Sequence, residues 1–94
     1  MDATLDRTFF ESRLHERFQV GEGPAEVELV ECNRLKSHAE EKREPFSLVF
    51  RGPAEPFLPQ RTYVLRNERT EPVEVFLVPV GRDAAGFLYE AVFN

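Results

Sequence analysis

The sequence predicts a small, mainly β domain: an antiparallel β-barrel or strongly curved sheet of about six strands, with a short N-terminal α-helix. Apolar and polar side chains alternate from Phe46 to Arg51, which is typical of a half-buried strand. Turns rich in glycine and proline separate such segments at short intervals. The chain has 94 residues, the length of one domain, so residues 1–94 are predicted to fold as a single unit.

The helix is predicted at residues 9–15. Thr8 and Glu11 have the spacing of a capping box, in which each side chain bonds the other residue's backbone N–H. Leu5 lies just ahead of this cap, where it would pack against the first turn. Residues 1–7 are expected to form a flexible N-terminus.

The strands are delimited by their turns. Gly21-Glu22-Gly23-Pro24 is a strong turn signal between the first two strands. The alternation in the second strand changes phase near Val30 and Glu31, which indicates a bulge. A polar loop is expected at residues 36–44. The predicted strands are residues 18–20, 25–35, 46–51, 62–66, 73–80 and 87–93, with turns at 67–72 and 81–86.

The core follows from the phase of the later strands, because a strand buries every second side chain on one face. Nine phenylalanines and no tryptophan indicate a core built largely from phenylalanine rings. The side chains predicted to be buried are Phe46, Leu48, Phe50, Val75, Leu77, Tyr89, Ala91 and Phe93.

Four segments carry a resemblance to a known family: FSLVFRG, PQRTY, FLVPVG and the terminal YEAVFN. On these segments the chain resembles a family of short bacterial domains of unknown function, over residues 14–94 and most specifically in the C-terminal half. The resemblance implies a bacterial origin and the β fold, and a genomic context of phage-tail-like proteins. It implies no activity and no catalytic residues.

The composition of the chain argues against nucleic acid and membranes as partners. The formal net charge is −5, with 17 acidic and 12 basic residues, whereas neutralising phosphates requires a basic patch. We therefore expect no nucleic-acid partner. The single cysteine cannot form an intramolecular disulfide, which fits a cytoplasmic location. No apolar run approaches the ~20 residues that span a bilayer, and the N-terminus has no signal-peptide pattern, so no membrane association is expected.

Candidate reactive residues have simpler structural interpretations. Glu11 and His15 are spaced as two ligands on one helix face, but no third or fourth metal donor lies nearby, so an exposed pair is favoured. Cys32 lies in a predicted strand without a nucleophile motif, which favours a core or half-core thiol. No glycine-rich phosphate loop is present. We predict no catalytic, cofactor-binding or metal residues.

The segment at residues 52–60 is the best candidate for a partner contact. Pro53, Pro56 and Pro59 hold it in an extended or turn conformation, and Phe57 and Leu58 lie between them. Either these two side chains contact a partner, or they fold back and seal the end of the barrel. Arg51 lies at the preceding strand end; it either contributes to the partner contact or pairs with an acid such as Glu55 or Glu90.

These observations favour a non-enzymatic protein-interaction or assembly module, present as a monomer or weak homodimer. The alternative is a small-ligand-binding β-barrel, which would require a cavity among the interior side chains. An enzyme would require a cleft with convergent titratable groups.

Overall fold

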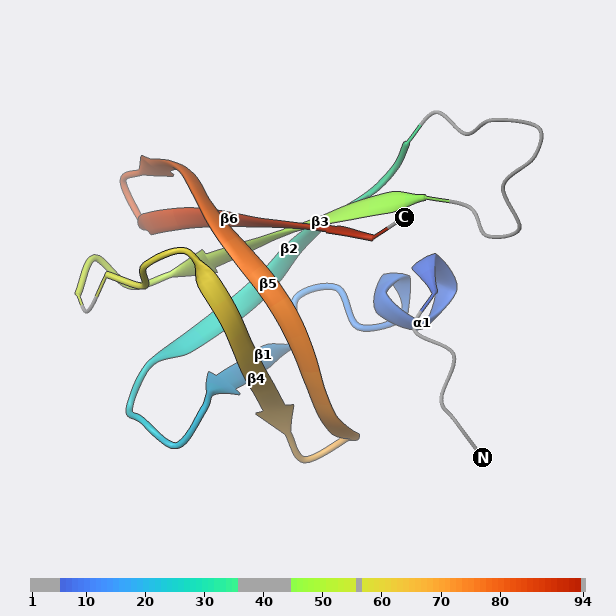
Figure 1. The fold of residues 1–94 in the computed structure, drawn as a ribbon, viewed down its shortest axis with the longest axis horizontal. Coiled ribbons are helices and arrows are strands. Elements are labelled where there is room, and N and C mark those ends of the chain that lie inside the picture. Colours follow the sequence, from blue (N-terminus) through green and yellow to red (C-terminus); the bar gives the residue numbers. More distant parts are fainter. Residues whose placement is uncertain (1–5, 36–44, 56, 94) are drawn as a thin grey trace.

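The computed structural model describes residues 6–35, 45–55 and 57–93. Its six antiparallel strands form a closed barrel in the order β1-β2-β3-β6-β5-β4 (Figure 1), which confirms the predicted fold class. A single short helix, α1, precedes them. The elements are α1 (Arg7–Glu11), β1 (Arg17–Val20), β2 (Glu26–Arg34), β3 (Phe46–Gly52), β4 (Arg61–Asn67), β5 (Thr70–Asp83) and β6 (Gly86–Phe93).

The first hairpin joins β1 to β2 through the predicted turn. Gly21 has φ 58°, a conformation that glycine adopts without steric cost. The predicted phase of β2 is confirmed at its start, where Val27 and Leu29 are buried while Glu26 is exposed. The predicted bulge is also confirmed, because the pairing of β2 with β3 shifts between Leu29 and Glu31.

Two ladders join strands that are distant in the chain. β3 pairs with β6 over seven residue pairs, from Phe46 opposite Phe93 to Gly52 opposite Phe87. β1 pairs with β4 over only two, Gln19 with Arg66 and Val20 with Leu65. The short ladder is the seam that closes the barrel.

The strand β5 is longer than predicted and changes its partner along its length. It pairs with β4 up to Leu77 and with β6 from Val78 onward. The prediction of a turn over residues 81–86 is wrong: Gly81 to Asp83 pair with β6, and the reversal is confined to residues 84–85. Gly86 has φ 147°, and a Cβ there would collide with the Gly52 carbonyl oxygen. Only glycine therefore fits this close approach of β6 to β3.

The barrel interior is filled with apolar side chains. Seven of the eight predicted core residues are buried, and the eighth, Phe93, is half-buried, with its ring stacked on Phe46 at a centroid distance of 4.8 Å. Phe18 and Phe50 meet edge to face at 6.2 Å. Further buried side chains are Phe10, Val20, Ala25, Val27, Leu29, Leu58, Leu65 and Val73.

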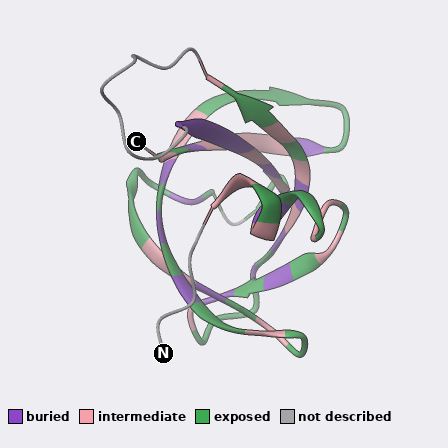
Figure 2. Ribbon diagram, turned by 90° about the vertical axis from the view of Figure 1, so that its right-hand side faces the viewer, coloured by how far each residue is buried: buried purple, intermediate pink, exposed green. Residues whose placement is uncertain are grey.

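The helix α1 closes one end of the barrel. Figure 2 looks onto this end and shows α1 within the ring of strands. Phe10 is buried there, with its ring 5.3 Å from that of Phe93 and 5.9 Å from that of Phe46. The rings of the first helix and the last strand therefore form one aromatic cluster.

The predicted capping box is wrong. The N-cap is Asp6, whose carboxylate accepts a hydrogen bond from the Phe9 backbone N–H at 2.9 Å. Glu11 pairs instead with Arg7, one turn earlier, at 2.8 Å. Aspartate is among the best N-cap residues, so the helix begins earlier than predicted and ends at Glu11. Residues 6 and 7 thus belong to the helix start, while residues 1–5, including Leu5, lie outside the described residues, as does the predicted loop at 36–44.

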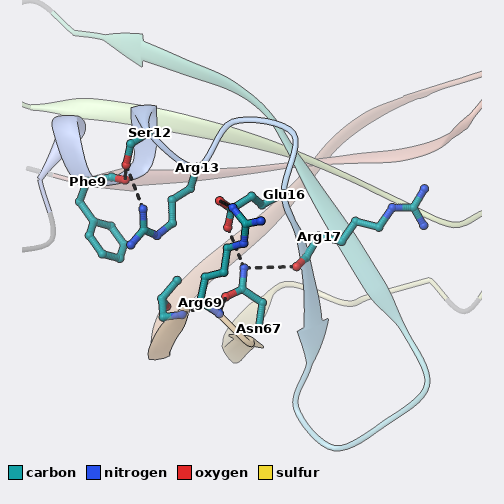
Figure 3. Close-up of polar contacts among 8 residues, drawn as sticks. Phe9, Ser12, Arg13, Glu16, Arg17, Asn67 and Arg69 are labelled. Carbon is teal, nitrogen blue, oxygen red and sulfur yellow. Dashed lines mark hydrogen bonds and ion pairs between the residues drawn. The ribbon is translucent and has the colours of Figure 1, made fainter.

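Asn67 ties the β4–β5 turn to the segment between α1 and β1 (Figure 3). Its Oδ1 accepts from the backbone N–H groups of Arg69 and Thr70, and its Nδ2 donates to the Glu16 carboxylate at 3.0 Å. Nearby, the Arg13 guanidinium lies over the Phe9 ring, 4.4 Å from its centroid. The described helix is far too short to span a membrane.

Candidate functional site

The segment after β3 passes over the barrel end opposite α1 (Figure 1). Its adjacent residues Phe57 and Leu58 differ in burial. Leu58 is buried, and its backbone N–H donates to the Tyr89 hydroxyl at 2.9 Å. Its side chain seals the barrel and is not at the surface, which corrects the expectation that Leu58 contacts a partner directly. Burying a leucine side chain in the barrel end removes apolar surface from water and so lowers the free energy of the folded state.

Phe57 remains at the surface, with 48% of its area exposed. Its ring meets Phe87 edge to face at 5.0 Å and lies 6.4 Å from the Tyr89 ring. Tyr89 therefore supports both residues: its hydroxyl holds the backbone of Leu58, and its ring lies beneath Phe57. The exposed Phe57 ring is therefore held in place by its contacts with Phe87 and Tyr89.

Arg51 forms an ion pair that differs from both predicted ones. Its Nη2 and Nε lie 2.8 and 3.2 Å from Asp83 Oδ2, so neither Glu55 nor Glu90 is its partner. The prediction missed Asp83 because β5 was expected to end before it. The hydrogen bond from Arg51, followed by that from the Ala85 N–H, lowers the pKa of Asp83. The same hydrogen bond raises the pKa of Arg51.

An open groove of about 610 Å³ lies beside this pair. Two of its charged lining residues are paired within the chain, Arg51 with Asp83 and Arg17 with Glu26 at 3.8 Å, and Glu28 lies 3.4 Å from the His15 ring. Such a surface offers no concentrated charge to an ionic ligand. The remaining lining residues are Pro24, Ala25, Val27, Gly52, Pro53, Glu55 and Ala85.

A family model described as a domain of unknown function, DUF6916, matches residues 5–93. The chain belongs to the DUF6916 family. The matched residues include the helix as well as the strands that carry the resemblance. No curated protein and no solved structure matches the chain.

In this DUF6916 domain, His15 and Cys32 make local contacts that do not form a reactive site. His15 is not on the helix with Glu11; it lies in the following loop with φ 73°, and its ring faces Glu28. Cys32 is half-buried, and its Sγ lies 3.7 Å from the Arg7 carbonyl oxygen. Burial, followed by the nearby Glu11 charge, raises the pKa of this thiol. Within residues 6–35, 45–55 and 57–93, no three His, Cys, Asp or Glu side chains are grouped to hold a metal ion.

Two contributors to the candidate surface were not singled out from the sequence. Phe87 supports Phe57, and the Tyr89 hydroxyl anchors Leu58. Alternation along β6 does predict that Tyr89 points inward, but a buried phenol also requires a hydrogen-bond partner. The sequence therefore indicates that the Tyr89 hydroxyl has a hydrogen-bond partner, but it does not identify the backbone group that bonds it.

Proposed function

We propose that this DUF6916 domain is a non-enzymatic protein-interaction module that binds a partner protein at the barrel end marked by Phe57. The observation that carries the proposal is the contrast between adjacent residues. Leu58 is buried and pinned by Tyr89, while Phe57 stays 48% exposed on the Phe87 ring. Aromatic side chains held in this way are favoured anchors in protein interfaces.

The rigidity of the segment supports the same function. Its prolines restrict the backbone before binding, and the bond to Tyr89 fixes the position of Leu58. Binding to a preorganised segment loses less conformational entropy. A hollow beside Phe87 would admit a partner's side chain; its other lining residues are Ala54, Arg82, Asp83, Ala84, Ala85 and Gly86.

A binding role is favoured over catalysis because several of the described titratable groups serve local structural contacts. Arg51 and Asp83 bond each other, Asp6 caps α1, and Glu16 accepts from Asn67. The half-buried Cys32 thiol has a raised pKa, which disfavours the nucleophilic thiolate. A ligand held inside the barrel is disfavoured because large side chains such as Phe18, Phe50 and Tyr89 occupy the interior.

The test compares Phe57→Ser with wild type and with Phe57→Tyr, which keeps the ring. Each protein is immobilised and exposed to a lysate of the source organism, and its unfolding in urea is measured separately. Phe57→Ser should stay within about 1 kcal/mol of wild-type stability yet lose the retained partner, whereas Phe57→Tyr should keep it.

Leu58→Ser is the matched structural control, since its side chain is buried. It should destabilise the domain by about 2–5 kcal/mol. Equal partner retention by wild type and a folded Phe57→Ser variant would refute the proposed surface.

A further inference from the structure

A second apolar surface lies on the side wall of the barrel. The described residues include four exposed large hydrophobic side chains, and three of them, Phe76, Val80 and Val92, belong to β5 and β6. We name this surface the β5–β6 outer face and define it by Phe76, Val78, Val80, Leu88, Glu90 and Val92.

The alternation of the two strands places these residues together on the outside. In β5, Val75 and Leu77 are buried, so Phe76 and Val78 point outward. In β6, Tyr89 and Ala91 are buried, so Leu88, Glu90 and Val92 point outward. Val80 lies at the register shift between Pro79 and Gly81, and it is 53% exposed.

Glu90 is at the centre of this face and is surrounded by apolar side chains. Its cross-strand neighbours are Val78 on β5 and Val49 on β3, and Leu88 and Val92 flank it along β6. Glu90 itself is half-buried. In residues 6–35, 45–55 and 57–93, no ion pair or hydrogen bond joins its carboxylate to another side chain.

Two further acidic side chains of the described residues lie near Glu90. Glu74 precedes Phe76 on the same side of β5, and Glu31 lies opposite Val49 on β2. The nearest base by register is Arg51, opposite Leu88, and Asp83 already holds its guanidinium through two hydrogen bonds. Within the part of the chain that the structure describes, the face thus combines exposed apolar side chains with a carboxylate that has no ion-pair partner.

We propose that the β5–β6 outer face docks a cationic, apolar segment of a partner protein, with a lysine or arginine opposite Glu90. Covering Phe76, Val80 and Val92 would remove apolar surface from water. Burying Glu90 without a counter-charge is costly, so a base at that position is needed for a favourable contact. A second copy of this chain fits less well, because the overlap would bring acidic faces of two chains with net charge −5 together. This surface is separate from Phe57, and the proposal does not rest on the barrel-end contact.

The test uses two synthetic amphipathic peptides of equal length, one of leucine and lysine and one of leucine and glutamate. Each is titrated into the ¹⁵N-labelled protein while amide chemical shifts are recorded. The lysine peptide should give saturable shifts centred on Phe76, Val78, Glu90 and Val92, without shifts at Phe57. The glutamate peptide should give none.

Charge reversal provides the matched control. Glu90→Lys should weaken binding of the lysine peptide about tenfold or more and allow the glutamate peptide to bind. Glu22→Lys makes the same change of charge in the exposed β1–β2 turn and should leave lysine-peptide binding nearly unchanged.

Three results would overturn the proposal. One is the absence of saturable shifts on this face. Another is equal weakening by Glu22→Lys and Glu90→Lys, which would mean that only net charge attracts the peptide. The third is a set of concentration-dependent shifts on the same face in the protein alone, which would identify the occupant as a second copy.

Discussion

At the scale of single residues, Tyr89 links the core to the candidate surface. Its side chain is fully buried, and its hydroxyl accepts the Leu58 N–H within the barrel end. A buried backbone N–H without a partner costs about 1–3 kcal/mol. One phenol therefore holds the segment that presents Phe57.

Tyr89→Phe tests this link. The ring is kept, so the expected loss is that of the unsatisfied Leu58 N–H, about 1–3 kcal/mol in the free energy of unfolding. Tyr63→Phe is the matched control, because the Tyr63 hydroxyl donates to the Pro59 carbonyl oxygen in an exposed hydrogen bond. Urea denaturation should show the larger loss for Tyr89→Phe. Equal losses in the two variants would mean that the buried hydrogen bond adds little.

The sequence predicts which residues are buried better than it predicts their polar contacts. The period of two along β3 and β6 places Phe50 and Tyr89 correctly, because burial depends only on local phase. The bond between Tyr89 and Leu58 joins residues far apart in the chain, and no local pattern encodes it. Which of Phe57 and Leu58 is buried likewise depends on the shape of the barrel end, which no local pattern encodes.

At the scale of elements, the predictions from the sequence are wrong mainly at the ends of the helix and the strands. The capping-box spacing of Thr8 and Glu11 predicts the wrong N-cap, because Asp6, two residues before Thr8, caps the helix. Glu11, which a capping box would direct to the Thr8 backbone N–H, pairs with Arg7 instead. Glycines at 81 and 86 suggested a long turn, but the backbone of Gly81 pairs with Leu88 and only Gly86 requires glycine geometry.

The extended β5 brings Asp83 to Arg51, and this contact between elements should depend on pH. The folded-state pKa of Asp83 is lowered, so its stabilising effect is present above the ordinary carboxyl pKa of about 4. That effect is lost as the pH falls through the folded-state value. Asp83→Asn should therefore lower the melting temperature near pH 6, and the difference from wild type should shrink below pH 4.

Thermal unfolding at a series of pH values measures this difference. Glu22→Gln removes an exposed turn carboxylate and serves as the control, which should follow the wild-type curve. A constant difference between Asp83→Asn and wild type across the whole range would show that the ion pair is not its source.

At the scale of the whole molecule, the number and direction of the strands follow from the sequence, but their order does not. Each hairpin is indicated by a local turn, as at residues 21–24. The β3–β6 and β1–β4 ladders join distant segments, so the sequence left a barrel and a curved sheet as alternatives. The two pairs between β1 and β4 decide in favour of the barrel.

We expect the same seam to determine how the domain opens. Joining it requires closure of a long stretch of chain. Two residue pairs, the bond from the Gly21 N–H to the Val64 carbonyl oxygen, and the bonds from Asn67 to Glu16 and Arg17 offset that entropic cost directly. We expect the seam to form late in folding and to separate first by local opening. In native-state hydrogen exchange, the Gly21 amide should lose protection at lower denaturant than the amides of the β3–β6 ladder. If both exchange only with global unfolding, the barrel has no weak seam. If the seam opens first, the barrel passes transiently through a curved sheet, and the two architectures that the sequence could not separate are then neighbouring states of one molecule.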